Sequence, residues 1–377
     1  MIELSAVGQP LSRRLLEAPG GFLWWYFDLV DSKGDGLVVI WSFGLPFLPG
    51  HASACRRGEL ALPVELPSLN ISVYRGGRID FYLLQQFEPA EARWHGDDSG
   101  SIWDFGESRI RSLRARRRRI VDLDLKLDVP GLDEKVLLRA AASGPEVAGD
   151  WPSGVENTDH SEVLPRHDWR PLLCARRAGA ELTVGRETSS LDGRVYHDRN
   201  GGSLPLHNLG IRWWSWGRVA MEDGELVYFV LDGHGGGRER IFLHINEDGR
   251  ARRLDPDVLR DEEVERTIAG LSVWRRARLR DDRGLHLDLD FRSAVDRGPF
   301  YQRALTQAFD GQGERHWGVA EFCEPGRVDW ARHRPLVRMR VHRRGEKNSM
   351  WLPLFSGPRR GRLKRFLSGL FSQSGGD

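Results

Sequence analysis

Short runs of β-branched and aromatic residues recur along most of the chain and are separated by turn-forming clusters. The clearest run is Ile120–Val129, in which Leu123, Leu125 and Leu127 alternate with aspartate and lysine. Because successive side chains of a strand point to opposite faces, this alternation predicts a half-buried β-strand. Similar runs are found at Phe22–Val30, Leu37–Phe43, Leu69–Tyr74, Ile79–Phe87, Leu226–Leu231, Ile241–Ile245 and Leu285–Phe291.

Glycine-rich clusters join these runs and indicate an all-β chain. Asp31–Gly36 and Arg75–Gly77 are typical of hairpin turns, since Gly and Asp adopt turn conformations at low cost. Helical periodicity is confined to Pro256–Ala269, which has an acidic start, and to the C-terminal tail. Many evenly spaced strands joined by hairpins favour antiparallel barrels or sandwiches over alternating βαβ units.

The chain of 377 residues is long enough for two domains or one large β structure. The polar stretch Arg186–Ser190 places a boundary there, so we expect domains at 14–188 and 189–355 and a tail at 356–377. Gly36–Cys55 has no charged residue, but its glycines, prolines and β-rich start predict a buried strand rather than a membrane span.

Composition excludes several classes of function. The 56 basic and 54 acidic residues nearly cancel, and the run Arg114–Arg119 has no interleaved aromatics, so nucleic-acid binding is not expected. Three dispersed cysteines and widely spaced histidines form neither a disulfide framework nor a metal site. No phosphate-binding or dinucleotide motif is found, so no cofactor is predicted. The N-terminus lacks the regions of a signal peptide, which favours a cytoplasmic location.

Two pairs of residues carry the candidate chemistry. Tyr196 and Asp198 are two positions apart, as are His167 and Trp169, so each pair shares one face of an extended strand. If the pairs converge, they form a proton donor among aromatic faces, suited to making and holding a carbocation. Arg199 points to the opposite face and need not neutralise Asp198. The alternative is that Asp198 only caps a turn before the following Asn-Gly-Gly sequence.

Tryptophan is abundant, with 14 residues, and it clusters at Trp24–Trp25 and at Trp213–Trp216. Most of these rings are expected to fill hydrophobic cores. Aromatic faces beside an acid also stabilise a cation, by about 0.5 to 2 kcal/mol each. Clustering alone does not separate the two roles.

The chain resembles the carotenoid 1,2-hydratase family, also called hydroxyneurosporene synthases, within a wider group of paired lipocalin-like proteins. The resemblance is carried by segments spread over most of the chain, namely Trp24–Asp28, Val39–Gly50, His167–Pro171, Gly193–Gly202, Trp214–Arg218, Gly318–Glu321 and Ser349–Phe355. It implies two lipocalin-like antiparallel β-barrel domains with few short helices.

The resemblance also implies cofactor-independent addition of water to the terminal C=C of an acyclic carotenoid or related isoprenoid. The family's His-x-Trp and Tyr-x-Asp pairs fall on His167, Trp169, Tyr196 and Asp198. Asp198 is expected to protonate the alkene and His167 to order the attacking water. We assign substrate contacts to Trp24, Trp25, Trp214, Trp216, His197 and Asn200. The alternatives are a terpene cyclase, a dehydratase or a Diels-Alder-type pericyclase on the same scaffold, and a non-catalytic carrier of apolar ligands.

The C-terminal tail predicts a basic amphipathic helix. Between Pro358 and Ser372, leucine and phenylalanine recur at helical spacing while arginine and lysine crowd the start. Such a helix docks on the protein itself or binds the surface of an anionic membrane. We expect the second, which would place the protein at the inner face of the cell membrane.

Overall fold

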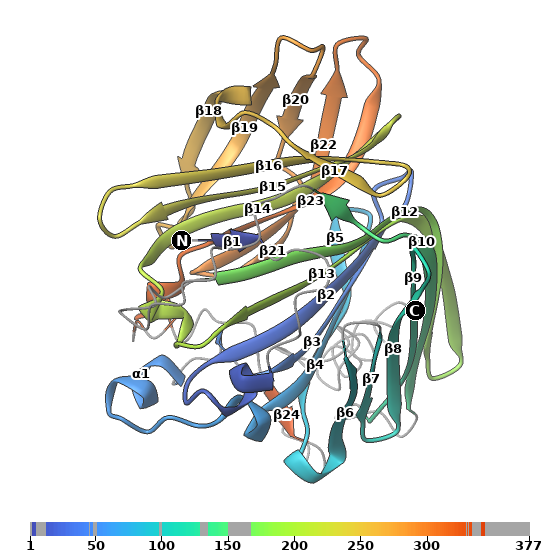
Figure 1. Ribbon diagram of the computed structural model, residues 1–377, viewed down its shortest axis with the longest axis vertical. Helices are drawn as coiled ribbons and strands as arrows, with labels where there is room; N and C mark the ends of the chain where they lie inside the picture. Colours follow the sequence, from blue (N-terminus) through green and yellow to red (C-terminus); the bar gives the residue numbers. More distant parts are fainter. Residues whose placement is uncertain are drawn as a thin grey trace, which may run out of the picture.

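The computed structural model describes residues 2–4, 13–44, 46–47, 51–97, 100–128, 135–149, 167–328, 330, 332–333 and 341–343. Within this part of the chain the strands form two sheets, one of 13 strands and one of 11 strands. Figure 1 shows the two sheets stacked along the long axis of the molecule. The prediction of an all-β fold with two antiparallel barrel-like units is confirmed.

The first sheet has the strand order β24-β5-β4-β3-β2-β13-β12-β10-β9-β8-β7-β6, with β1 beside β12. Its strands are β1 (Ile2–Leu4), β2 (Phe22–Val30), β3 (Gly36–Phe43), β4 (Pro67–Arg75), β5 (Arg78–Gln86), β6 (Ala92–Asp97), β7 (Gly100–Phe105), β8 (Ser108–Ala115), β9 (Arg118–Leu127), β10 (Val136–Pro145), β12 (His167–Val184), β13 (Glu187–Gly202) and β24 (Val341–Arg343).

The second sheet has the order β11-β17-β16-β15-β14-β23-β22-β20-β19-β18, with β21 beside β22. Its strands are β11 (Ala148–Gly149), β14 (Ile211–Met221), β15 (Gly224–Gly233), β16 (Arg238–Asn246), β17 (Arg250–Arg253), β18 (Leu259–Arg266), β19 (Ser272–Arg280), β20 (His286–Asp290), β21 (Ala294–Arg297), β22 (Tyr301–Asp310) and β23 (Arg315–Cys323). The helical segments are short: α1 (His51–Arg56), η1 (Arg13–Glu17), η2 (Pro63–Glu65), η3 (Pro89–Glu91), η4 (Leu206–Asn208), η5 (Pro256–Val258) and η6 (Pro325–Arg327).

The strands predicted from alternation are all present, and the Gly36–Cys55 segment begins with the buried strand β3. The helix predicted at Pro256–Ala269 is wrong, because η5 is followed at once by the edge strand β18. Cross-strand ion pairs occupy its charged positions, with Glu263 bound to Arg275 and Asp261 to Arg278 on β19. Ladder hydrogen bonds and these pairs outweigh the helical propensity of the segment. The C-terminal amphipathic helix lies outside the described residues.

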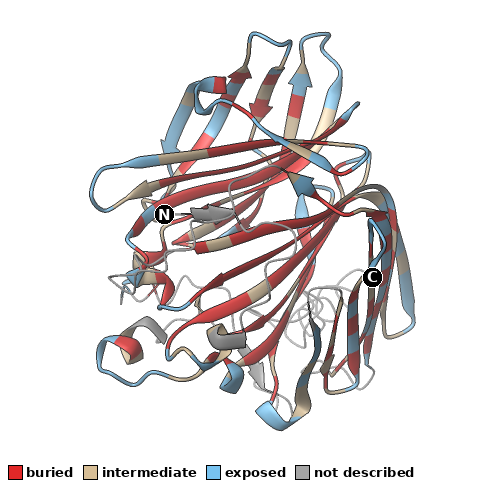
Figure 2. Cartoon of the chain, viewed as in Figure 1, coloured by how far each residue is buried: buried red, intermediate tan, exposed pale blue. Residues whose placement is uncertain are grey.

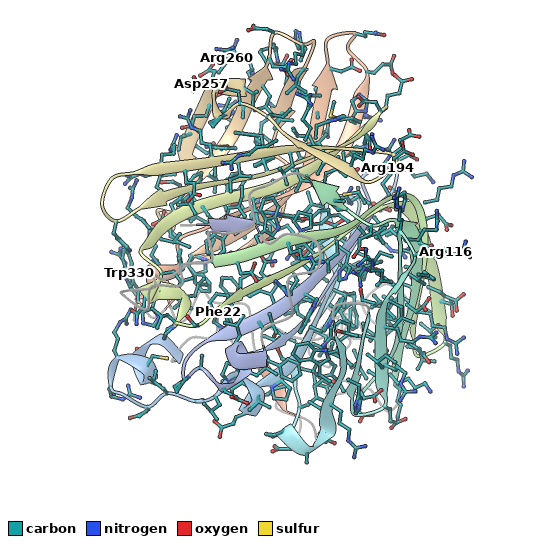
Figure 3. All side chains as sticks on the ribbon, in the orientation of Figure 1. Phe22, Arg116, Arg194, Asp257, Arg260 and Trp330 are labelled. Atoms are coloured by element: carbon teal, nitrogen blue, oxygen red, sulfur yellow. The ribbon has the colours of Figure 1, made fainter. Side chains whose placement is uncertain are left out.

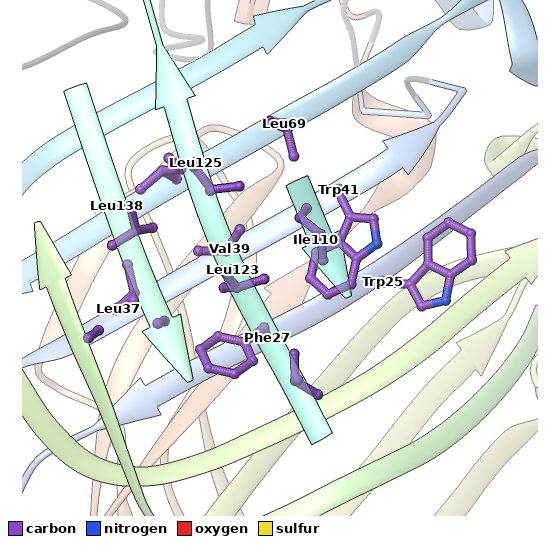
Figure 4. Close-up of a cluster of buried hydrophobic side chains, with 14 of the residues drawn as sticks. Trp25, Phe27, Leu37, Val39, Trp41, Leu69, Ile110, Leu123, Leu125 and Leu138 are labelled. Atoms are coloured by element: carbon purple, nitrogen blue, oxygen red, sulfur yellow. The ribbon is translucent and has the colours of Figure 1, made fainter. Parts of the chain in front are cut away.

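Three hydrophobic clusters account for the core. One fills the interior of the first barrel and includes Trp25, Phe27 and Trp41. Figure 4 draws these side chains together with Leu123 and Leu125 of β9 and Leu138 of β10. A second fills the sheet that begins with β14. The third lies between the two sheets and takes residues from both, including Trp169 and Trp216. Figure 2 shows the strands at this junction buried along most of their length.

The long hairpin of β12 and β13 belongs entirely to the first sheet. The chain passes to the second sheet between β13 and β14, whereas the boundary expected at residue 188 falls at the hairpin turn. The division into domains at 14–188 and 189–355 stays a proposal. In the described residues, no helix has both the length and the apolar character needed to span a membrane.

Candidate active site

The candidate catalytic residues lie on neighbouring strands of the first sheet, on the face that meets the second sheet. Trp169 is on β12, and Tyr196 and Asp198 are on β13. Pro171 cannot donate a backbone hydrogen bond, and the register of the two strands shifts between Pro171 and Leu173. Bulges of this kind change the aim of nearby side chains.

The carboxyl group of Asp198 accepts three hydrogen bonds. Its Oδ2 accepts from Trp169 Nε1 at 2.8 Å and from the Tyr196 hydroxyl at 2.9 Å. Its Oδ1 accepts from Asn200 Nδ2 at 2.9 Å. The predicted convergence of the two pairs is therefore seen in the structure. Because Asp198 is an interior residue of β13, the turn-capping alternative is wrong.

Burial governs the protonation of Asp198, of which only 2% is exposed. Loss of solvation raises the pKa of Asp198 to about 8, although the hydrogen bonds from Trp169 and Tyr196 act in the opposite direction. Glu321 and Asp28 add repulsion that raises this pKa further. Asp198 is therefore mostly neutral at pH 7, which is the state that a general acid requires.

Arg199, the next residue in the chain, does not form an ion pair with Asp198. Its guanidinium donates to Asp168 Oδ2 at 2.5 Å, and both residues point away from the face that carries Asp198. Among the described residues, no ion pair involves Asp198. As expected for adjacent residues of a strand, Arg199 faces away from Asp198 and pairs with Asp168.

His167 joins the site through Asn200. Its Nε2 lies 2.9 Å from Asn200 Oδ1, and burial lowers the pKa of His167 to about 4, so the ring is neutral at pH 7. Since Asn200 donates its amide to Asp198, its oxygen accepts the Nε2 proton of His167. The other ring nitrogen, Nδ1, is buried and has no hydrogen-bond partner within the described residues. Nδ1 is therefore able to accept a hydrogen bond.

The residues assigned to substrate binding divide between two faces. Trp24, Trp214 and Trp216 lie in the cluster between the sheets, with the Trp24 ring 5.3 Å from that of His167. Trp25 and His197 point into the first barrel instead, where His197 stacks on Trp41 at 5.4 Å. Adjacent strand residues face opposite ways, so these two are not brought to the acid.

A cavity lies beside this cluster. The space between its lining residues, including the part open to solvent, is about 900 Å³. Its apolar lining comes from both sheets and from the segment after β3, namely Trp24, Ile40, Pro46, Phe47, Leu84 and Trp214. Asp198 is not part of the lining. Trp24 and Trp214 separate the cavity from His167, because both rings line the cavity and pack on the imidazole.

Tyr26 connects the cavity to the acid, and the sequence reasoning missed it. It lies directly opposite Asp198 in the pairing of β2 with β13, and its ring also lines the cavity. The ring packs 4.9 Å from Trp216 and 6.3 Å from Tyr196. Its spacing of two from Trp24 was the available signal, since both residues share one face of β2. Figure 3 places Phe22, at the start of this strand, between the two sheets.

The fold and the site are those of a paired-barrel protein with an acid buried at its junction. The model of a family described as carotenoid hydratase CrtC matches residues 153–350. A protein of Chlorobaculum tepidum named hydroxyneurosporene dehydrogenase is 25% identical over 89% of this chain and 91% of its own length. The acyclic carotenoid 1,2-hydratase of Thiocapsa roseopersicina is 27% identical over 77% of this chain and 65% of its own. The chain belongs to the carotenoid hydratase family and is an enzyme of the hydratase type.

A solved structure supports the fold independently. A putative AttH from Nitrosomonas europaea superposes with a TM-score of 0.55, covering 85% of this chain and 99% of its own at 15% identity. At this identity the likeness concerns the fold alone. In the described residues, no group of three or more His, Cys, Asp or Glu side chains is arranged to hold a metal ion.

Proposed function

We propose that the protein adds water to the terminal C=C of an acyclic carotenoid or related isoprenoid without a cofactor. The observation that carries the proposal is the buried carboxyl of Asp198, held by Trp169, Tyr196 and Asn200 beside an aromatic-lined cavity. The family match and the name of the Thiocapsa roseopersicina relative support this substrate class.

In the proposed reaction, Asp198 transfers its proton to the less substituted alkene carbon and leaves a tertiary carbocation. The donors Trp169 and Tyr196 stabilise the carboxylate that remains, and their π-systems face the developing charge. A water molecule bonds through its oxygen to the cationic carbon. Its extra proton passes to the Asp198 carboxylate, which restores the acid and balances the reaction.

His167 is proposed to order that water. A neutral imidazole whose Nε2 proton is committed to Asn200 presents Nδ1 as an acceptor for a water O–H. The rings of Phe22, Trp24, Trp214 and Phe229 surround His167 and exclude other water. A dry site protects the cation from uncontrolled reaction. The alkene end is proposed to reach the acid past Tyr26 and Trp24.

The substrate is proposed to come from a membrane, with the basic tail at 356–377 holding the enzyme at the inner face. A hydrocarbon polyene is concentrated in lipid, so an interfacial helix would shorten its path to the cavity. No nucleic acid is expected as a partner. The tail lies outside the described residues, and its role rests on its sequence pattern.

The experiment compares the wild-type enzyme with Asp198→Asn on lycopene or neurosporene in vesicles. The wild type is expected to give a product heavier by one water, and the variant to lose about 10² to 10⁴-fold in rate while keeping its β-sheet circular dichroism. An Asp198→Asn enzyme with the wild-type rate would contradict the role of the acid. A product of unchanged mass would indicate a cyclase or pericyclase, and ligand binding without any product would indicate a carrier.

A further inference from the structure

The cavity has one polar end, built around Arg303. This side chain is buried, with 3% exposed, and its Nε and Nη2 donate to Glu321 Oε1 at 2.9 and 2.8 Å. Its Nη1 donates to the hydroxyl of Tyr74. Glu321 lies between Trp216 and Arg303 on neighbouring strands, so the polar end is part of the junction that holds the acid.

Three phenol groups line the same cavity and have no use in the proposed mechanism. The hydroxyl oxygens of Tyr26, Tyr82 and Tyr301 are buried and make no well-aligned hydrogen bond within the described residues, although Asp28 lies near the Tyr26 hydroxyl and Asn70 near that of Tyr82. The Arg303 guanidinium lies 5.5 Å from the centre of the Tyr301 ring. A buried hydroxyl left without a partner costs about 1 to 3 kcal/mol. Three such groups around one cavity indicate that a polar atom of a ligand belongs there.

The charges of the polar end restrict that ligand to a neutral group. Among the described lining residues, Arg303 is the one cation, and three of its five N–H donors bind Glu321 and Tyr74. An anion would face the carboxyl groups of Glu321 and Asp296, and a cation would face Arg303. A hydroxyl oxygen suits the phenols best, because each phenol can both donate to it and accept from it.

We propose that the Arg303 end of the cavity binds one hydroxyl oxygen through Tyr26, Tyr82 and Tyr301. This site rests on the proposed function, since the same cavity receives the isoprenoid end. The oxygen comes either from an alcohol group on the isoprenoid or from a water molecule that the cavity holds and supplies to the position ordered by His167. The two sources share one chemistry, and the two experiments below distinguish them.

The first experiment measures binding by quenching of tryptophan fluorescence, since Trp24 and Trp214 line the cavity. The ligands are farnesene and its alcohol farnesol, and the variant is Tyr82→Phe/Tyr301→Phe. Loss of hydrogen bonds to a neutral hydroxyl is expected to weaken farnesol binding by about 2- to 10-fold per bond, with farnesene binding unchanged. Tyr228→Phe is the control, because its buried hydroxyl lies inside the second barrel, away from the cavity, and also lacks a well-aligned hydrogen bond within the described residues, with only Ser215 nearby.

The second experiment follows the fate of the cation in heavy water. Protonation puts deuterium on the alkene, and water capture then gives a deuterated alcohol. Without capture, the cation loses a proton from an adjacent carbon to the Asp198 carboxylate and returns as a deuterated alkene. If the site supplies the water, Tyr82→Phe/Tyr301→Phe is expected to raise the ratio of deuterated alkene to alcohol several-fold over Tyr228→Phe.

Each outcome either supports or overturns the proposed hydroxyl site. Weakened farnesol binding supports the site with an isoprenoid alcohol as its ligand, and a raised alkene ratio supports it with water. If the double variant matches Tyr228→Phe in both experiments, the hydroxyl site is overturned. Absence of any hydrated or deuterated product from the wild type would instead overturn the proposed function, and the binding experiment would still test the site.

Discussion

At the scale of the residue, burial and hydrogen bonding change the pKa of Asp198 in opposite directions. Three donors favour its charged form, but burial removes more solvation than the donors replace, and its pKa rises to about 8. A carboxylate offers about four acceptor positions, and three of them are occupied. The remaining position is where the transferable proton would reside.

The first prediction concerns the pH dependence of hydration. A general acid works only while protonated, so kcat/KM is expected to be level near pH 6 to 7 and to fall about tenfold per pH unit above about pH 8. His167, with a pKa of about 4, remains neutral over this range and adds no step. Initial rates measured from pH 6 to 10 test this. A profile that rises above pH 8 would contradict the assignment of Asp198.

The second prediction concerns Tyr196→Phe. The Tyr196 hydroxyl donates to Asp198 and lowers its pKa, so removal of this donor is expected to move the alkaline limb to higher pH. The rate is also expected to fall by about 10- to 100-fold, since one donor to the developing carboxylate is lost. A limb that moves to lower pH, or stays in place, would show that another group titrates.

At the scale of the element, β13 shows which features of the site the sequence could predict and which it could not. The spacing of two placed Tyr196 and Asp198 on one face, as the structure has them. The same rule, applied fully, would have excluded His197 beside Asp198 and Trp25 beside Trp24, because adjacent residues cannot share a face. The strands were predictable because alternation is a local signal.

The polar end of the cavity was not predictable. Arg303 and Glu321 lie more than a hundred residues beyond Asp198 in the chain, and only the packing of two sheets brings them near it. Glu321 belongs to the Gly318–Glu321 segment that carries the family resemblance, but the sequence predicts no role for it. The edge strand β18 was predicted as a helix because cross-strand partners are not visible in one segment.

The third prediction tests how closely β13 and β2 must pack. A Cβ atom at Gly193 would lie 2.2 Å from the backbone oxygen of Val30, so Gly193→Ala must push the strands apart. We expect a loss of about 1 to 3 kcal/mol in the free energy of unfolding, measured with urea, and a lower hydration rate. Gly235→Ala is the control, since nothing lies within 4 Å of its added methyl group. Equal stability of the two variants would contradict the prediction.

At the scale of the whole molecule, a buried ion pair joins the two sheets. Arg218 on β14 binds Asp28 on β2 and, at 2.6 Å, Glu225 on β15. The side chains of Arg218 and Asp28 are fully buried. Such a pair contributes little net stability compared with an apolar contact, but removal of one partner leaves a charge stranded in the core. It fixes how the sheets are placed against each other.

The fourth prediction follows from this arrangement. Arg218→Met is expected to cost about 3 to 5 kcal/mol in the free energy of unfolding, because Asp28 loses its buried cation and Glu225 keeps, among the described residues, only Arg194, at 3.9 Å. Arg238→Met is the matched control. That arginine also binds two carboxylates but is 31% exposed, and we expect a loss of about 1 kcal/mol or less. Similar losses in urea unfolding would show that the junction does not depend on Arg218.

The two faces of β13 line different parts of the protein, and this affects how directed evolution should be designed. Its alternate residues line the first barrel and the acid site, so the proposed acid Asp198 is anchored to the hydrophobic core of the first barrel. Selection for a new substrate range should therefore enrich changes at interior positions such as Val195 and His197 as well as at the cavity wall. Libraries restricted to the cavity wall would miss the interior positions that fix the orientation of the Asp198 side chain.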